Sequence, residues 1–368
     1  MKYTILREKL LNTLQKAGFF TSYRLGDIEA LRGVLIQARR SGISIRTTNI
    51  ADTFYGKVGG KVEEEGDVLV DYKTLLEVIK NVRDEKIFVE KKKNTLHIKT
   101  IAGEVKILTL DDTLFPQEQE CDWEDQEEKF FNQDEVDHVA FAAATDETRP
   151  ILTGIYYDIR EDGTYIVSTD GFRLSLVTKK TNTKKKGGGK KFIIPAKSVQ
   201  AALKILGKDI LKTQTDKEFS KLRVLSEDSH ITIRFLEGEF PPYEKAIPQQ
   251  ASTSVRFKSE DFLNALKTVS LFSKDGSNMV ELTIKDTELE LFSVRSTSGE
   301  ARLSIPLLSK EGKNNKIVFN HKFLSAYFSM NQAKEVVFEM DEPNTPGLFK
   351  SGGRSNFVHI VMPIRSQE

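Results

Sequence analysis

Few residues of this chain have side chains that are typical of catalytic or metal sites, and they are widely spaced. Cys121 is the only cysteine, so no internal disulfide can form. The five histidines fall in different segments: His97, His138, His230, His321 and His359. Neither a CxxC nor an HExxH spacing is present, and we therefore expect no metal site and no cofactor.

Two further segments invite a catalytic interpretation. Asp170, in the sequence Thr169-Asp170-Gly171, could act as a general base, but no second carboxylate or histidine lies at a motif spacing. Asp before Gly is typical of a turn. The basic glycine-rich segment 184–191 (KKKGGGKK) lacks both phosphate-binding spacings, GxxxxGK[ST] and GxGxxG, which favours a flexible loop. We predict no catalytic residue and no intrinsic enzymatic activity.

Length and composition limit the protein class. At roughly 150 residues per domain, 368 residues predict two or three domains. Lys and Arg total 55 and Asp and Glu total 54, which argues against a protein that grips nucleic acid by its overall charge. The 39% hydrophobic content is enough for several cores, and no apolar run approaches the roughly 18 residues of a membrane span. We expect a cytoplasmic protein without a membrane partner.

The chain contains an internal repeat. Alternating apolar residues starting at Leu31 are followed by Gly42 and Thr48, and the same types recur at Leu152, Gly163 and Thr169, each 121 positions later. A fainter third copy begins near residue 280. Each copy is typical of a β-hairpin with one buried face, with turns expected at 39–42, 160–163 and 285–288.

Helical spacing of apolar residues precedes and follows each hairpin, so each third of the chain is a doubled helix-and-strand unit. Helices are expected near residues 5–16, 71–82, 134–143, 195–206, 259–269 and 320–330, with Asp134 and Ser259 as N-caps. We predict an α+β protein of three similar domains, 1–120, 129–250 and 253–368, with linkers near 117–129 and 248–254. The repeat alone is compatible with a closed ring or a linear stack.

Four motifs carry a resemblance to a known family: 148–154 (TRPILTG), 168–174 (STDGFRL), 238–243 (GEFPPY) and 359–365 (HIVMPIR). Together with the repeat they resemble the bacterial DNA polymerase III sliding clamps, the beta subunits. The resemblance implies the DNA-clamp fold, with two helices packed on antiparallel sheets in each domain and a head-to-tail homodimer closing into a six-domain ring.

The same resemblance implies a function and partners. Double-stranded DNA would pass through the ring, held topologically and without sequence preference, at the bacterial nucleoid. The clamp would be a non-catalytic processivity factor of the polymerase holoenzyme. It would tether the replicative polymerase subunit and other proteins carrying clamp-binding peptides, and it would meet a clamp loader. The alternative is a repeat-built scaffold that binds proteins without encircling DNA.

A near-neutral charge suits a ring that slides, because a strongly salt-dependent contact would slow it. The helix candidates carry more Lys and Arg than Asp and Glu. We expect the following residues to face DNA, with ordinary solvated helix faces as the alternative: Lys9, Lys73, Lys80, Arg149, Lys197 and Lys204.

The resemblance also implies a cleft where partner peptides insert bulky apolar anchors, between the second and third domains. The matching positions are Leu152, Thr169, Gly171, Phe172, Arg173, Leu174, Pro241, Lys245, Ala246, Ile360, Val361, Met362, Pro363, Ile364 and Arg365. A plain core role is the alternative for Leu174, Ile360 and Met362.

Some positions depart from the family pattern. Phe172 stands where His is common, Lys245 and Ala246 stand where Arg and a larger aliphatic residue are usual, and Ser366–Glu368 extend the chain. These departures affect partner preference rather than the existence of the pocket.

For ring closure, the resemblance assigns Leu271 and Phe272 of the third domain and Val105 and Ile107 of the first to the subunit interface. Their alternation also suits an ordinary strand interior.

Overall fold

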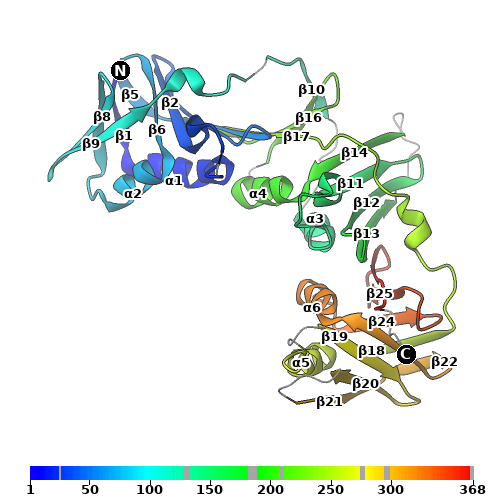
Figure 1. The fold of residues 1–368 in the computed structure, drawn as a ribbon. Coiled ribbons are helices and arrows are strands. Elements are labelled where there is room, and N and C mark those ends of the chain that lie inside the picture. The colour runs from blue at the N-terminus through cyan, green and yellow to red at the C-terminus, as the bar shows by residue number, and fades with distance from the viewer. Residues whose placement is uncertain are drawn as a thin grey trace. The chain divides into compact units, whose positions relative to one another are not determined.

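A computed structural model describes residues 1–24, 26–118, 120–126, 133–180, 189–207, 210–273, 278–293 and 299–364 (Figure 1). The chain forms two compact units. The first combines residues 1–130 with 201–235, and the second combines 131–200 with 236–368. The unit boundary therefore cuts through the predicted central domain. No helix among the described residues is long and apolar enough to span a membrane.

The first unit is built on one antiparallel sheet, in which thirteen strands are described, in the order β10-β15-β16-β17-β4-β3-β2-β6-β9-β8-β7-β1-β5. The strands are β1 (Lys2–Leu6), β2 (Gly33–Arg39), β3 (Gly42–Thr48), β4 (Asp52–Val58), β5 (Gly60–Glu64), β6 (Gly66–Asp71), β7 (Lys86–Lys92), β8 (Thr95–Thr100), β9 (Gly103–Leu110), β10 (Trp123–Gln126), β15 (Lys212–Asp216), β16 (Lys221–Leu225) and β17 (Ser229–Arg234).

Helices α1 (Arg7–Ala17) and α2 (Tyr72–Asn81) pack against each other, and α1 covers strands β3 and β4. Leu10 and Leu14 bury one face of α1. The side chain of Asp71 caps α2 by accepting a hydrogen bond from the Thr74 N–H at 2.8 Å. Glu8 and Lys9 of α1 and Lys73, Glu77 and Lys80 of α2 are exposed.

The second unit holds two sheets among its described residues. Nine strands follow the order β14-β11-β12-β13-β26-β25-β24-β18-β22, and four follow β21-β20-β19-β23. Their bounds are β11 (Gly154–Ile159), β12 (Gly163–Thr169), β13 (Arg173–Lys180), β14 (Lys190–Pro195), β18 (Thr253–Lys258), β19 (Met279–Ile284), β20 (Glu288–Ser293), β21 (Arg302–Pro306), β22 (Ser309–Gly312), β23 (Asn315–Asn320), β24 (Glu335–Met340), β25 (Gly347–Ser351) and β26 (Phe357–Val361).

Helix α3 (Gln133–Ala140) packs on β12 and β13, and α5 (Ser259–Ser270) packs on α6 (His321–Met330). Aromatic rings fill the core under α5 and α6: Phe262 lies 5.0 Å from Phe257 and 4.3 Å from Phe328 between ring centroids. Helix α4 (Ala196–Leu206) contains the boundary between the two units.

The predicted hairpins and mixed α+β architecture are confirmed. Arg39 pairs with Gly42, Ile159 with Thr164 and Ile284 with Leu289, which places the turns where the sequence indicated.

Some element boundaries were predicted wrongly. Ile5 lies in β1 between β5 and β7 rather than in the first helix, because pairing on both edges outweighs helical spacing. Lys258, not Ser259, is the N-cap of α5, and Asp134 lies inside the first turn of α3. Part of the first predicted linker forms β10, which pairs with β15.

Candidate functional site

Strands β13 and β26 join the second and third repeats of the sequence in one sheet. They pair antiparallel with Leu174 opposite Ile360 and Arg173 opposite Val361. The two segments lie more than 180 residues apart in the chain, yet this register places two predicted pocket residues, Leu174 and Ile360, side by side. The family motifs 168–174 and 359–365 therefore meet at one place in the second unit.

Leu174 and Ile360 belong to a buried group that we call the apolar cluster: Val167, Leu174, Leu176, Tyr243, Leu348 and Ile360. Ala246 and Ile247, which directly precede the predicted linker 248–254, pack against it and are partly buried. Leu174 is 4% exposed and Ile360 1% exposed. These two side chains are thus core residues and can form the floor of a pocket. Its walls must come from neighbouring exposed side chains.

Phe172 and Met362 supply exposed apolar surface beside this floor. Phe172 is 57% and Met362 41% exposed, and the Met362 N–H donates a 2.8 Å hydrogen bond to the Phe172 carbonyl. The Phe172 ring stacks on Phe323 of α6, with centroids 6.4 Å apart. Large exposed apolar side chains next to a buried cluster suit the anchoring of an apolar ligand.

The turn 169–173 fixes these side chains. One oxygen of Asp170 accepts the backbone N–H groups of Phe172 at 2.9 Å and Arg173 at 3.0 Å, while the other pairs with the Arg173 guanidinium at 3.0 Å. Thr169 accepts from the Gly171 N–H at 3.0 Å, and Gly171 has a φ of +91°. The Asp170 carboxylate thus holds the turn, which supports the turn interpretation over a catalytic one.

Arg173 also connects the turn to aromatic rings. Its guanidinium lies 4.9 Å from the Phe323 centroid and 5.7 Å from the Phe141 centroid. Sequence reasoning assigned Phe323 only to a helix face and did not connect it with the pocket. Its position at helical spacing was visible in the sequence, but its contact with Phe172 and Arg173 depends on tertiary structure.

The 3-10 turn Tyr243–Ala246 is held by a charged network. The Arg160 Nε donates to Asp158 at 2.8 Å, and its guanidinium also binds the Tyr243 hydroxyl at 2.7 Å and pairs with Glu244. Burial raises the pKa of Tyr243, so its hydroxyl stays protonated. This network keeps Tyr243 in the apolar cluster and Ala246 at its edge.

The remaining predicted pocket residues have different environments. Leu152 is buried in the 3-10 turn Pro150–Thr153, while Pro241 and Lys245 are exposed. Pro363 and Ile364 are half-buried, and the Ile364 N–H donates to the Val318 carbonyl at 2.8 Å. Arg365 and the extension 366–368 lie outside the described residues.

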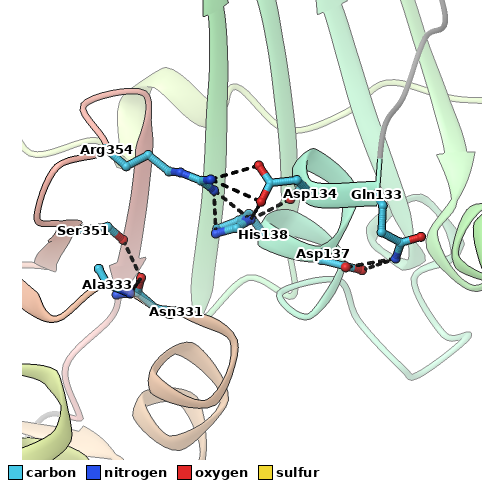
Figure 2. A network of polar contacts seen from close by, with 8 residues as sticks. All are labelled: Gln133, Asp134, Asp137, His138, Asn331, Ala333, Ser351 and Arg354. Atoms are coloured by element: carbon cyan, nitrogen blue, oxygen red, sulfur yellow. Dashed lines mark hydrogen bonds and ion pairs between the residues drawn. The ribbon is translucent and has the colours of Figure 1, made fainter.

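A polar network ties α3 to the turn between β25 and β26 (Figure 2). Arg354 pairs with Asp134 at 3.0 Å and approaches both ring nitrogens of His138, at 2.8 and 3.1 Å. Close by, Asn331 at the end of α6 accepts from Ser351 at 2.9 Å. The Arg354 contacts link segments on both sides of the β13–β26 junction and support its geometry.

The predicted DNA-facing residues are all exposed: Lys9, Lys73, Lys80, Arg149, Lys197 and Lys204. Lys73 lies 3.9 Å from the Tyr23 ring centroid and Lys204 lies 5.3 Å from that of Phe19. Lys80 pairs with Glu77 at 2.7 Å. Arg149 precedes a 3-10 turn and is the one member of the set outside the helices.

The predicted interface residues divide into exposed and buried ones. Leu271, after α5, is 59% exposed, whereas Ile107 of β9 is 6% exposed and packs inside its sheet. Val105 and Phe272 are half-buried. Leu108, which the sequence analysis passed over, is 78% exposed on the same strand.

Within the described part of the chain, no group of three or more His, Cys, Asp or Glu side chains is arranged to hold a metal ion.

Comparisons with known proteins match this architecture over its whole length. Family models for the N-terminal, central and C-terminal domains of the DNA polymerase III beta subunit match residues 1–118, 127–242 and 244–365. The beta sliding clamp of Bacillus subtilis is 25% identical over 389 residues, covering 100% of both chains. That of Chlamydia muridarum is 24% identical over 374 residues, covering 99% of both.

Solved structures share the fold. A sliding clamp from Bacillus subtilis superimposes with a TM-score of 0.89 at 22% identity, over 100% of this chain and 99% of that one. A sliding clamp from Pseudomonas aeruginosa bound to griselimycin gives 0.87 at 20% identity, over 100% of both chains. Because the three family models together cover nearly the whole sequence, this chain belongs to the bacterial DNA polymerase III beta subunits, the sliding clamps, which are non-catalytic processivity factors.

Proposed function

We propose that this protein closes as a head-to-tail homodimer around duplex DNA and tethers the replicative polymerase and other DNA-replication and repair proteins to it. Loading would require a clamp loader, and the site of action would be the cytoplasm at the nucleoid. Three domains, 1–120, 129–250 and 253–368, would supply each half of the ring.

One observation carries the tethering part of this proposal. Phe172 and Met362 are exposed at the β13–β26 junction, next to the buried Leu174 and Ile360. An apolar peptide side chain that covers them would remove apolar surface from water without reorganising the core. Methionine adapts to different side chains, which suits a site that takes several partners.

The charge distribution supports the DNA part. The exposed Lys9, Lys73, Lys197 and Lys204 lie on helices α1, α2 and α4, while the chain as a whole has a formal charge of +1. A few lysines on an otherwise balanced protein give weak, sequence-independent contacts with phosphates. Such contacts allow sliding when retention on DNA is topological.

Two incompletely paired strand edges support dimer closure. Gly103–Leu108 of β9 pair with β8 on one side, and among the described residues the pairing of β9 with β6 covers only Thr109 and Leu110. Strand β21 ends its sheet and pairs with β20. We propose that β9 of one protomer pairs with β21 of the other, with Leu271 and Leu108 beside the joint, because unpaired edges favour strand addition.

The test is retention on circular DNA. The full-length protein, loaded on a nicked plasmid by a clamp loader, is expected to stay bound through gel filtration and to be released when the plasmid is linearised. Release that is independent of linearisation would indicate ordinary DNA binding. No retention on the closed circle would favour the protein-binding scaffold instead.

A further inference from the structure

The repeat places a second site in the first unit, at the position that corresponds to the apolar cluster. Strand β4 pairs with β17 in the register in which β13 pairs with β26. Thr53 faces Thr232 at the place where Leu174 faces Ile360, and Thr53 precedes Leu174 by the repeat offset of 121 residues. The two junctions are therefore equivalent parts of the repeat.

The side chains around the two junctions differ in chemistry. Arg46 stands 121 positions before Val167, and Arg223 faces Thr232 across β16 and β17 as Leu348 faces Ile360 across β25 and β26. Glu118 follows the pair Phe115-Pro116 as Tyr243 follows Phe240-Pro241. Charged residues thus occupy three positions of the apolar cluster. We call Arg46, Glu118 and Arg223 the arginine cluster.

The arginine cluster has more positive than negative charge. Glu118 pairs with Arg223 at 2.8 Å and with Arg46 at 3.6 Å, so one carboxylate serves two guanidinium groups. The two arginine side chains are only 17% and 13% exposed. The Arg46 Nε is buried and makes no hydrogen bond among the described residues. A partly buried excess charge of this kind favours a bound anion.

Neighbouring groups reflect the same positive field. Burial first, and then Arg223, lowers the pKa of His230 to about 4, with further contributions from Arg46 and Lys57 and an opposing one from Glu118. Arg223 lies 3.9 Å from the Trp123 ring centroid, which fixes its guanidinium in place.

A cavity of about 200 Å³ opens beside the cluster. It is lined by Arg46, Glu118, Lys221, Arg234, Ile50 and Trp123, among others. Arg234 is exposed, makes no ion pair within the described residues, and is the last residue of β17. It comes directly after Ile233, which pairs with β4, as Met362 comes directly after Val361, which pairs with β13. A larger adjoining cavity has a mixed lining of acidic and basic side chains, among them Glu120, Asp122, Lys217, Glu218, Lys221 and Arg223.

Ile50 provides an apolar edge at this cavity under backbone strain. It has a φ of +80° and is 56% exposed, at the repeat position where Gly171 has a φ of +91°. A β-branched residue is disfavoured in this left-handed region, and its exposed side chain gains little from packing. A role in ligand contact explains why an isoleucine occupies this position.

We propose that this cavity binds an acidic peptide segment of a partner protein. One peptide carboxylate would lie between Arg234 and the arginine cluster, and an adjacent aliphatic side chain would rest on Ile50 and Trp123. The inference extends beyond the proposed function, since it requires neither DNA nor the apolar cluster.

The probe is a fluorescein-labelled, N-acetylated peptide in which two central glutamates are flanked by leucines. Anisotropy at low salt with the full-length protein is expected to show saturable binding that is lost when the glutamates become glutamines. Arg234→Glu should weaken binding by about tenfold, and Arg234→Lys should largely retain it. Binding by the Arg234→Glu variant that equals the wild type would overturn the proposal.

A second variant separates binding from folding. Ile50→Gly relieves the left-handed strain, so the melting temperature should not fall, while peptide affinity should drop by roughly threefold or more. Unchanged affinity in this variant would refute the assigned apolar contact.

Two controls identify the site. Met362→Ala should leave binding of the acidic peptide unchanged, and loss of binding there would place the peptide at the apolar cluster and refute the inference. A duplex DNA oligonucleotide should displace the labelled peptide from the wild type no more effectively than from the Arg234→Glu variant. Stronger competition would indicate a phosphate-binding site instead of a peptide site. Retention on circular DNA is measured separately, so its failure would not affect this result.

Discussion

Phe172 and Met362 differ from the other predicted pocket residues because their side chains are exposed. Leu174 and Ile360 are already buried in the apolar cluster, so truncating either would cost about 2–5 kcal/mol of folding free energy and obscure any effect on binding. The exposed pair can be changed with little effect on the core. These residues are thus the informative ones for partner binding.

We expect Phe172→Ala and Met362→Ala each to weaken a clamp-binding peptide by about tenfold, because each removes apolar contact area at the proposed peptide site. The melting temperature should change little. Isothermal titration with the same peptide measures the effect. Phe19→Ala removes a 48% exposed phenylalanine in the first unit and is the matched control, whose affinity should equal the wild type. Equal losses in all three variants would contradict the assigned site.

His359 is fully buried at the same junction. Its Nδ1 lies 2.8 Å from the Ser175 Oγ, and its ring stacks on Tyr327 with centroids 4.9 Å apart. Burial, reinforced by Arg173, lowers the pKa of His359 to about 3. The folded state therefore keeps this histidine neutral at pH values where the unfolded chain binds a proton.

This shift predicts acid sensitivity. Below a pH of about 6.5 the unfolded state takes up a proton that the folded state rejects until about pH 3, so the free energy of unfolding falls as the pH drops through that window. Urea unfolding at pH 7 and pH 4.5 measures the loss. His359→Gln can keep a hydrogen bond to Ser175 and should show a smaller loss between the two pH values. An identical loss would assign the acid sensitivity to other groups.

At the scale of elements, the sequence predicted the features that depend on the pattern of apolar residues within a short segment. Hairpin β2–β3 and its counterparts follow from alternating apolar residues around a polar turn. Ile5 was misassigned because apolar spacing over a few residues fits a helix as well as a strand. The junctions β4–β17 and β13–β26 join strands that are far apart in sequence, and nothing local specifies such pairing.

The candidate site followed the same division. Family motifs located Leu174 and Met362, but not which of the two is exposed, since exposure depends on the strands packed around each. Phe323 was not predicted as a site residue, because its role depends on α6 lying beside the turn at Phe172.

The prediction for the dimer concerns Leu271, which directly follows α5. Leu271→Lys would place a charge in the proposed subunit interface, so the dimer dissociation constant should rise by at least about tenfold. Sedimentation velocity measures the monomer fraction over a concentration series. Leu211→Lys, at a residue 66% exposed in the first unit, is the control and should sediment as the wild type does. A Leu271→Lys variant that remains fully dimeric would remove this residue from the interface.

At the scale of the whole molecule, the charges nearly cancel, so weak binding to DNA and long retention on DNA must be considered separately. The overall charge of +1 gives little bulk attraction to DNA, so the proposed contacts with phosphates rest on local lysines. If retention is topological, weakening those contacts lowers the affinity for linear DNA but has little effect on how long the loaded protein stays on a circle.

We therefore expect a variant with Lys9, Lys73, Lys197 and Lys204 all changed to Gln to remain on closed-circular DNA once loaded. Its binding to linear duplex should show a shallower dependence of log K on log salt concentration, by roughly three to four units of slope if all four contact phosphates. Changing Lys310, Lys313, Lys316 and Lys350 to Gln provides a control with the same net charge. Equal changes of slope in both variants would contradict the assigned DNA-facing set.

The strand pairing between β4 and β17 has a practical consequence for dividing the protein into pieces. A fragment ending at residue 118 matches one family model, yet it would lose the partner of β4 and leave Asp52–Gly56 as an open edge. Such an edge invites self-association in solution, so the isolated fragment should be prone to aggregate. A fragment that also supplies residues 201–235, as a second chain, would restore the missing strands. The repeat divides the sequence into three similar segments, whereas the sheets decide which segments a fragment must contain to leave no strand edge open.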